Sequence, residues 1–181
     1  MQGPPKWYME QKRGATMTGG QSELYWQLEY ERQEARVARK AAKKKKRKKK
    51  DPNSIPELTK RLDRVFSLWV RHSAAKDGWV KCYTCDHTAE VHKLHAGHYV
   101  PRQVKTLRWN PCNVHPQCYA CNMFYGGRPQ DYRDALIEEY GVEDVEALEQ
   151  MRHKESPWTR VTLAEEIERY ERLLLELGVD L

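Results

Sequence analysis

Two Cys-x-x-Cys pairs are the strongest chemical signal in this sequence of 181 residues. The four cysteines are Cys82, Cys85, Cys118 and Cys121. Two such pairs supply four thiolates, which is the ligand set of a closed, tetrahedral zinc site. The sequence therefore predicts structural Zn²⁺, with a buried cluster of reduced cysteines as the alternative. Cys112, the remaining cysteine, is not needed to complete this shell, so we expect no ligand role for it.

Histidine and asparagine side chains occur between the two pairs and directly after them. They are His95, His98, Asn113, His115 and Asn122. These residue types bind catalytic metal ions, and an imidazole with a pKa of about 6.5 can accept a proton from water at neutral pH. The combination favours a zinc-stabilised nuclease over a plain zinc finger.

The offsets of three of these residues match a known catalytic motif. Residues 97–102, Gly-His-Tyr-Val-Pro-Arg, have the form of the strand end that presents the general base in HNH nucleases. Asn113 lies five residues before Cys118, and Asn122 directly follows Cys121. These positions correspond to the middle and last letters of the motif in its histidine–asparagine–asparagine form. A lone His or Asn is more often a turn residue, but the offsets from two cysteine pairs favour the catalytic interpretation.

Further short motifs extend the likeness over about the last 120 residues. They are residues 82–85, 95–99, 107–110, 113–115, 117–118, 121–122, 126–127, 132–133, 136–137 and 158–159, followed by the terminal helix. Together they resemble the NinG (Rap) recombination endonucleases of lambdoid phages. The site is also similar to the phage endonuclease VII type of junction resolvase, in which two Cys-x-x-Cys pairs surround the catalytic loop. The resemblance implies an α+β fold: a zinc-stapled ββα-metal (HNH-like) core with flanking helices and a basic, largely extended or helical N-terminal arm.

The resemblance also implies a reaction and a role for each motif residue. The expected reaction is metal-dependent hydrolysis of DNA phosphodiesters in phage recombination, on branched DNA such as Holliday junctions or D-loops. His98 would be the base that activates water, Asn122 would bind the catalytic ion, and Asn113 would fix the loop and orient His98. The alternatives are a general HNH DNA nuclease and a noncatalytic zinc-dependent DNA-binding recombination accessory protein.

A second ligand of the catalytic ion must come from another position, because the residue that usually supplies it is a glycine in this chain. Many HNH sites place Asp or His immediately before the base, where this chain has Gly97. His95 is the expected substitute, and an imidazole ligand would favour Mn²⁺ beside Mg²⁺. His115 would be a third ligand or a phosphate contact, with a bracing role in the strand as the alternative.

Charge is divided unevenly along the chain. Residues 1–50 hold 15 Lys/Arg and 5 Asp/Glu, residues 51–130 hold 11 and 6, and residues 131–181 hold 6 and 15. The basic first two-thirds indicates a polyanionic partner, whereas the acidic last third is unsuited to a phosphate backbone. We expect DNA contacts, with solvated charge as the alternative for any single residue, from Arg102, Lys105, Arg108, Arg128, Lys43, Lys44, Lys45, Lys46, Arg47, Lys48, Lys49 and Lys50.

The expected partners and location follow from the same properties. Symmetric cleavage of a four-way junction needs two active sites, so we expect a homodimer formed through apolar surfaces of the C-terminal helices. Recombination proteins are further expected partners. No apolar run approaches the roughly 20 residues of a membrane helix, and the N-terminal charges are not followed by the apolar core of a signal peptide. We therefore expect a soluble protein of the bacterial host cytoplasm.

Composition, apolar spacing and turn residues, together with the core that the resemblance implies, predict five parts. They are a disordered terminus (1–21), a basic helical arm (22–52), a docking helix (53–78), the HNH-like core (79–141) and the C-terminal helices (142–181). Within them we expect helices at 56–75, 129–140 and 142–151, a short strand at 79–83 and a hairpin-like stretch at about 94–100. The segment around Val114 is expected to lead into the second cysteine pair. The last helix is expected to begin at a capping box of Thr162 and Glu165.

Overall fold

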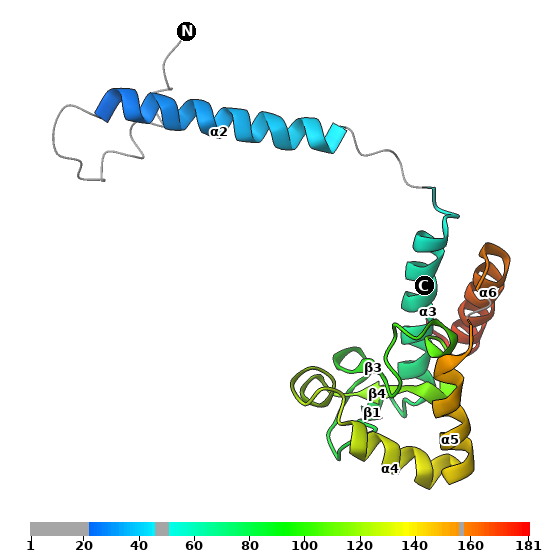
Figure 1. Ribbon diagram of the computed structural model, residues 1–181. Helices are drawn as coiled ribbons and strands as arrows, with labels where there is room; N and C mark the ends of the chain where they lie inside the picture. Colours follow the sequence, from blue (N-terminus) through cyan, green and yellow to red (C-terminus); the bar gives the residue numbers. More distant parts are fainter. Residues whose placement is uncertain (1–21, 46–50, 156–157) are drawn as a thin grey trace. The chain divides into compact units, whose positions relative to one another are not determined.

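The structure is a computed structural model that describes residues 22–45, 51–155 and 158–181. The chain divides into two units, Met1–Lys49 and Lys50–Leu181. The first contains helix α2 (Ser22–Lys45), drawn in blue in Figure 1. None of the described side chains of α2, at positions 28–42, is buried, so the expected basic helix has no apolar stripe that packs on a core. The terminus 1–21 and the basic residues 46–50 lie outside the described residues.

The second unit contains two small antiparallel sheets. Strand β1 (Trp79–Lys81) pairs with β2 (Thr88–Glu90), and β3 (His95–His98) pairs with β4 (Val114–Gln117). In the second sheet His95 lies opposite Gln117, and His98 lies opposite Val114. The strand expected at 79–83 is confirmed with shorter bounds as β1. Strand β3 lies within the hairpin-like stretch expected at 94–100, and β4 begins at Val114, in the segment expected to lead into the second cysteine pair. Strand β2 was not anticipated, because two of its three residues, Ala89 and Glu90, are of types depleted in strands.

Helices α3 (Ile55–Ser73) and α6 (Arg160–Glu176) form the largest apolar core. Leu62 and Phe66 of α3 are buried against Ile167 and Tyr170 of α6, and the rings of Phe66 and Tyr170 meet edge to face at 4.9 Å. A bidentate ion pair between Arg61 and Glu171 closes the edge of this contact, with a shortest distance of 2.7 Å. Ala96 and Val114 of the β3–β4 sheet pack on the same core, so this helix pair supports the strand that carries His95 and His98.

Helices α4 (Pro129–Tyr140) and α5 (Val142–Gln150) cover a separate core. Tyr132, Leu136 and Val145 are buried there with Val100 and Leu107 from the segment between β3 and β4. The apolar faces of α5 and α6 are therefore used inside the chain. Other apolar side chains of these helices, Val142, Val161 and Leu175, remain exposed, so the expected homodimer stays a prediction. None of the helices in the described part of the chain combines the length and apolarity needed to cross a membrane.

The start of α6 differs from the sequence prediction. Its N-cap is Thr159, whose side chain accepts a hydrogen bond from the backbone of Thr162 while Thr162 reciprocates. The helix begins three residues earlier than the Thr162/Glu165 box because the chain is anchored just before it. The indole of Trp158 donates a hydrogen bond to the carbonyl of Lys105 at 2.8 Å and packs edge to face on Trp109.

Replacing the observed cap should destabilise the protein, whereas replacing the residue predicted from sequence should not. Thr159→Ala removes the acceptor for a free backbone N–H, so we expect a loss of about 1 kcal/mol in the free energy of unfolding. The matched control, Glu165→Gln, is expected to change that free energy by less than about 0.5 kcal/mol. Urea unfolding of both variants followed by circular dichroism measures the difference, and equal losses would contradict the assignment of the cap.

Candidate metal centre and catalytic site

The four cysteines of the two pairs converge on one point. Cys82 and Cys85 lie in the turn between β1 and β2, Cys118 follows β4, and Cys121 lies in the π-helix η4 (Ala120–Phe124). Their four Sγ atoms all lie within 4.8 Å of one another, and those of Cys85 and Cys118 are 3.9 Å apart. Tetrahedral zinc with Zn–S bonds of about 2.3 Å separates its sulfurs by about 3.8 Å. The cluster can therefore hold a metal ion such as zinc, and Cys112 lies outside it.

Backbone N–H donors lower the pKa of these thiols, whereas burial raises it. Burial raises the pKa of Cys82, but N–H donors from Cys118 and Thr84 outweigh it and bring the pKa to about 7. Burial raises the pKa of Cys85 to about 12 and also raises that of Cys118. Four thiolates in this space need a bound cation to balance them, which is the chemistry that a structural zinc ion supplies.

Two of the predicted catalytic-ion ligands meet beside the cysteine cluster. The side-chain amide nitrogen of Asn122 lies 3.0 Å from Nδ1 of His95. An amide nitrogen can only donate, so Nδ1 is the ring nitrogen that carries a lone pair. Asn122 reaches His95 because His95, at the start of β3, pairs with Gln117 at the end of β4, and η4 follows β4 almost directly. The pair carries an imidazole nitrogen and an amide oxygen, but Nδ1 accepts the Asn122 N–H, so this hydrogen bond must break before Nδ1 can bind an ion. Both side chains are half-buried.

Asn113 is buried and uses its side chain to hold the loop after β3. Its amide nitrogen donates to the carbonyls of Val100 and Leu107, both at 3.0 Å, and its oxygen accepts from the backbone N–H of Val100 at 2.7 Å. Its own carbonyl accepts from the N–H of Tyr99. The side chain thus has the contacts that a loop-fixing residue next to His98 requires.

His98 is not brought to the His95–Asn122 pair. His98 is three positions after His95 along β3, an odd offset, so the two side chains leave opposite faces of the strand. The ring Nε2 of His98 lies 3.0 Å from the carbonyl of Arg108; a carbonyl only accepts, so Nε2 donates and Nδ1 is the nitrogen able to take a proton. Burial lowers the pKa of His98, with Arg102 adding to the effect, so the ring is neutral at pH 7, as a general base must be.

The space beside Gly97 explains why no ligand precedes His98. A Cβ built on Gly97 would lie 2.1 Å from the side-chain oxygen of Gln117, which is fully buried. The Gln117 amide nitrogen donates to Thr84 and to the carbonyl of Gly127, so its position is fixed. Any side chain at position 97 would displace Gln117, and His95, two residues earlier on the same face, is the nearest strand position that can offer a ligand.

His115 lies in a cage of aromatic side chains. Its ring stacks on Tyr83 at 3.9 Å, and its two nitrogens lie 3.1 Å from the hydroxyl of Tyr132 and 3.3 Å from that of Tyr140. Burial lowers its pKa to about 4, against a smaller opposing effect of Glu139. With both nitrogens engaged, the geometry favours the bracing alternative over a role as metal ligand.

The basic side chains around the site differ in their exposure and in how many hydrogen bonds they make within the protein. Asp63 of α3 accepts two hydrogen bonds from Arg108, at 2.8 and 2.6 Å, and a longer one from Arg102. Arg128 donates to the carbonyl of Thr84 and pairs with Asp131. The side chains of Arg102 and Lys105 remain exposed and are better placed for phosphate contacts than Arg108. Side chains at 43–50 lie outside those that the structure describes.

Asp63 is the residue of this region that the sequence did not reveal. It lies 45 residues before Arg108, on a helix whose apolar spacing signals only packing, and it also accepts from the indole of Trp109 at 2.9 Å. No local motif could indicate this contact, because it arises only when α3 docks on the loop after β3. Asp63 fixes the arginines that flank His98.

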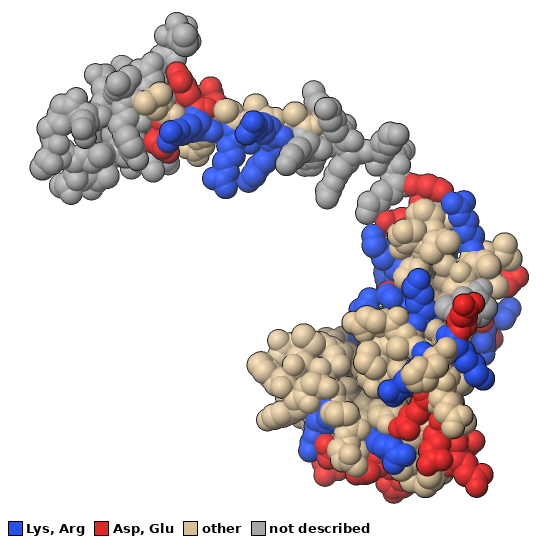
Figure 2. All heavy atoms as spheres, viewed as in Figure 1, with Lys and Arg blue, Asp and Glu red and all other residues tan. Residues whose placement is uncertain are grey.

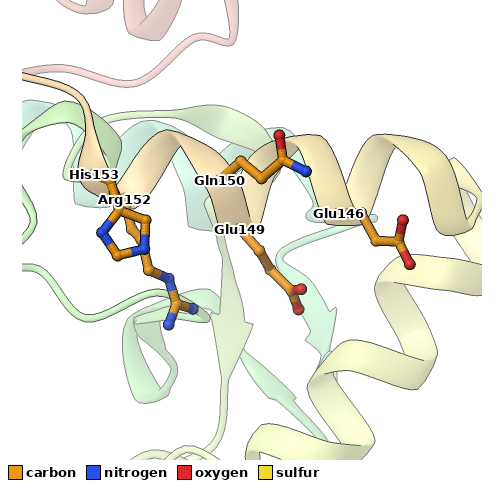
Figure 3. A pocket seen from close by; sticks show the side chains of 5 residues that line it. All are labelled: Glu146, Glu149, Gln150, Arg152 and His153. Atoms are coloured by element: carbon orange, nitrogen blue, oxygen red, sulfur yellow. The ribbon is translucent and has the colours of Figure 1, made fainter.

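A separate pocket lies at the acidic end of the molecule. It is lined by Glu146, Glu149, Gln150, Arg152 and His153, whose side chains project from α5 and the turn after it (Figure 3). Its main carboxylate is already engaged, because Glu149 accepts hydrogen bonds from Arg133 and from Tyr99. The pocket shares no residue with the cysteine cluster or the His95–Asn122 pair, so it is not part of the candidate site.

The fold and the site define a class: a small mixed helix-and-sheet domain organised around a four-cysteine metal site. The family model described as "Bacteriophage Lambda NinG protein" matches residues 8–178. The chain therefore belongs to the NinG family of bacteriophages.

Individual relatives agree with this assignment. "Protein ninG" of Salmonella phage P22 is 31% identical over 101 residues, and its counterpart in Escherichia phage lambda is 32% identical over 101 residues. Each match covers 55% of this chain and 47% of the relative. The chain thus spans about half the length of the curated relatives it matches. No solved structure matches it.

Loss of one cysteine ligand should unfold the second unit. We expect Cys82→Ser and Cys118→Ser to lose bound zinc and helical structure, because binding to a structural site contributes roughly 10–16 kcal/mol to folding. Cys112→Ser is the matched control and should keep both. Zinc content by mass spectrometry and far-ultraviolet circular dichroism test this; a folded, zinc-free Cys82→Ser chain would contradict the structural role.

His115 should make the protein acid-sensitive. Its pKa falls from 6.5 to about 4 on folding, so the unfolded chain binds the proton more tightly and stability drops as the pH falls from about 6.5 to 4. The shift corresponds to about 3 kcal/mol. His115→Phe keeps a ring on Tyr83 but cannot titrate, so the wild type should lose about 3 kcal/mol more than the variant across this window.

Urea unfolding of both chains between pH 7 and 4 measures this difference. Acid release of a metal affects both chains and cancels in the comparison. Parallel stability profiles of the two chains would show that His115 is not the sensitive group.

Proposed function

We propose that this NinG-family protein is a metal-dependent endonuclease that hydrolyses phosphodiesters of branched DNA, such as Holliday junctions or D-loops, during phage recombination. The observation that carries the proposal is the His95–Asn122 pair, held 3.0 Å apart directly beside the four-cysteine cluster. A purely structural zinc module has no need for a second, half-buried pair of metal-binding side chains. The HNH-like order of His98, Asn113 and Asn122 supports the same conclusion.

The pair suits a loosely held catalytic cation. Among the described residues, the four cysteines are the only group of three or more His, Cys, Asp and Glu side chains placed to share an ion, so the pair would bind its ion through two protein groups. Such an ion keeps positions open for water and for phosphate oxygens. A bound Mg²⁺ or Mn²⁺ would neutralise charge on the scissile phosphate and stabilise the leaving 3′ oxygen.

His98 is the proposed base, and this role requires a rearrangement that brings its ring closer to Asn122. Its Nδ1 is the free basic nitrogen, and the ring faces the loop that carries Arg102 and Arg108. Catalytic contacts are often incomplete in a free enzyme, so the separation of His98 from Asn122 defines a change that DNA binding must bring about. The hydrogen bond between His98 and the Arg108 carbonyl must break, or the His98 side chain must rotate, for the base to approach the phosphate that the catalytic ion binds.

A noncatalytic DNA-binding module is the second candidate. The observation that favours it is the engagement of His98 by the Arg108 carbonyl on the face away from Asn122. In that case His98 positions the arginine loop, and His95 and Asn122 stabilise the end of β3. Exposed Arg102 and Lys105 would supply sequence-independent phosphate contacts in either case.

The two candidates differ in a cleavage assay with labelled linear, forked and four-way DNA. We expect cutting of the branched substrates with Mg²⁺ or Mn²⁺, leaving 5′-phosphate and 3′-hydroxyl ends. His98→Ala should lower the rate by about 10²–10⁴-fold, and His95→Ala and Asn122→Ala should lose metal-dependent cutting. His153→Ala, an exposed histidine outside the site, is the matched control and should retain full activity.

Each other outcome excludes one candidate. DNA binding without cutting in either metal would refute the nuclease and leave the binding module. Equal cutting of linear and four-way DNA would refute the branch preference and leave a general HNH nuclease. Sedimentation of the chain with and without junction DNA tests the proposed homodimer, whose contact surface must differ from the buried faces of α5 and α6.

A further inference from the structure

The π-helix that carries Asn122 and its two flanking residues bear a group of exposed apolar side chains. The group consists of Tyr119, Met123, Phe124 and Tyr125, which are 53%, 58%, 74% and 65% exposed. We call these four residues the apolar tip. The coil after β4 in Figure 1 corresponds in Figure 2 to an uncharged, tan projection from the second unit.

The projection is uncharged because of the local sequence. No Lys, Arg, Asp or Glu occurs between Arg108 and Arg128. The acidic side chains gather elsewhere, on the lower face in Figure 2, where Figure 1 places α4 and α5. An uncharged aromatic surface neither attracts nor repels phosphate, but its ring faces can stack on flat heterocycles.

The apolar tip is continuous with the candidate metal pair. The ring of Tyr119 meets that of His95 edge to face at 5.6 Å and that of Phe124 at 5.4 Å. Asn122 precedes Met123 in the same π-helix. A ligand lying on the tip would therefore be held next to the phosphate that the pair is proposed to bind.

The size of the tip argues against a second copy of the chain as its occupant. Large side chains have about 150–250 Å² of surface, so four that are half to three-quarters exposed offer roughly 500 Å². A stable protein interface buries about 800 Å² on each partner. The tip is convex and smaller than that, and its dimensions suit a few stacked bases.

We infer that the apolar tip is a stacking surface for unpaired DNA bases at a branch point. The inference rests on the proposed function and deepens it by assigning the feature of the substrate that the site recognises. Bases inside a duplex are covered by their neighbours, whereas bases at a fork or junction expose a free ring face. Stacking on Phe124 and Tyr125 would therefore select branched DNA without reading its sequence.

The test uses the full chain and forked DNA carrying 2-aminopurine at the unpaired position beside the branch, without added Mg²⁺ or Mn²⁺. We expect the protein to quench this fluorescent base in the fork and not in a linear duplex. Phe124→Ala with Tyr125→Ala should remove the quenching and weaken fork binding at least about fivefold, with duplex binding unchanged. Phe124→Tyr keeps a ring and should behave like the wild type. Leu175→Ala, an equally exposed apolar residue on α6, is the matched control.

Several results would overturn the inference. Unchanged quenching in the double variant, or equal losses on fork and duplex, would show that the tip does not stack on unpaired bases. A wild-type dimer that becomes monomeric in the double variant would assign the tip to a second copy instead. Quenching without cleavage would refute the nuclease while supporting the stacking surface, and cleavage without quenching would refute the stacking surface alone.

Discussion

The convergence of four thiols on one point is the constraint on which the rest of the second unit depends. Cys82 and Cys85 belong to the β1–β2 turn, and Cys118 and Cys121 belong to the end of β4 and to the π-helix. The apolar cluster around them contains little beyond Val80, Ala89 and Leu94. So small a core cannot by itself offset the entropy of ordering these segments, and a metal ion such as zinc, which the four thiols can hold, would supply the missing free energy.

The pairing register of β3 and β4 carries this constraint to the candidate site. His95 and Gly97 face the cysteine cluster, whereas Ala96 packs on the α3–α6 core. A slip by one residue would exchange these faces and separate His95 from Asn122. The buried side chain of Gln117 occupies the space beside Gly97 and so excludes other residues there. The helix pair on one face and the cysteine cluster on the other therefore hold one register together.

Helices were predictable because an amphipathic stripe is a local property. Leu58, Leu62, Val65 and Phe66 recur at helical spacing and are all buried in α3. The start of α6 was not predictable from the sequence, because Thr159 and Thr162 both suit an N-cap. Only the anchoring of Trp158 decides between them. Strand β2 escaped notice because its three residues are ordered by pairing with β1 rather than by their own pattern.

By itself, the sequence identified the four cysteines that can hold a metal ion and the existence of the helices, because both depend on residue type and short spacing. The loop-fixing role expected of Asn113 followed from the family resemblance. Only the tertiary structure decided which polar groups meet. Strand alternation brought His95 to Asn122 and turned His98 toward Arg108, and helix docking placed Asp63 on the arginines. These contacts join residues 10 to 45 positions apart, and such distances in space are set by packing that no local pattern encodes.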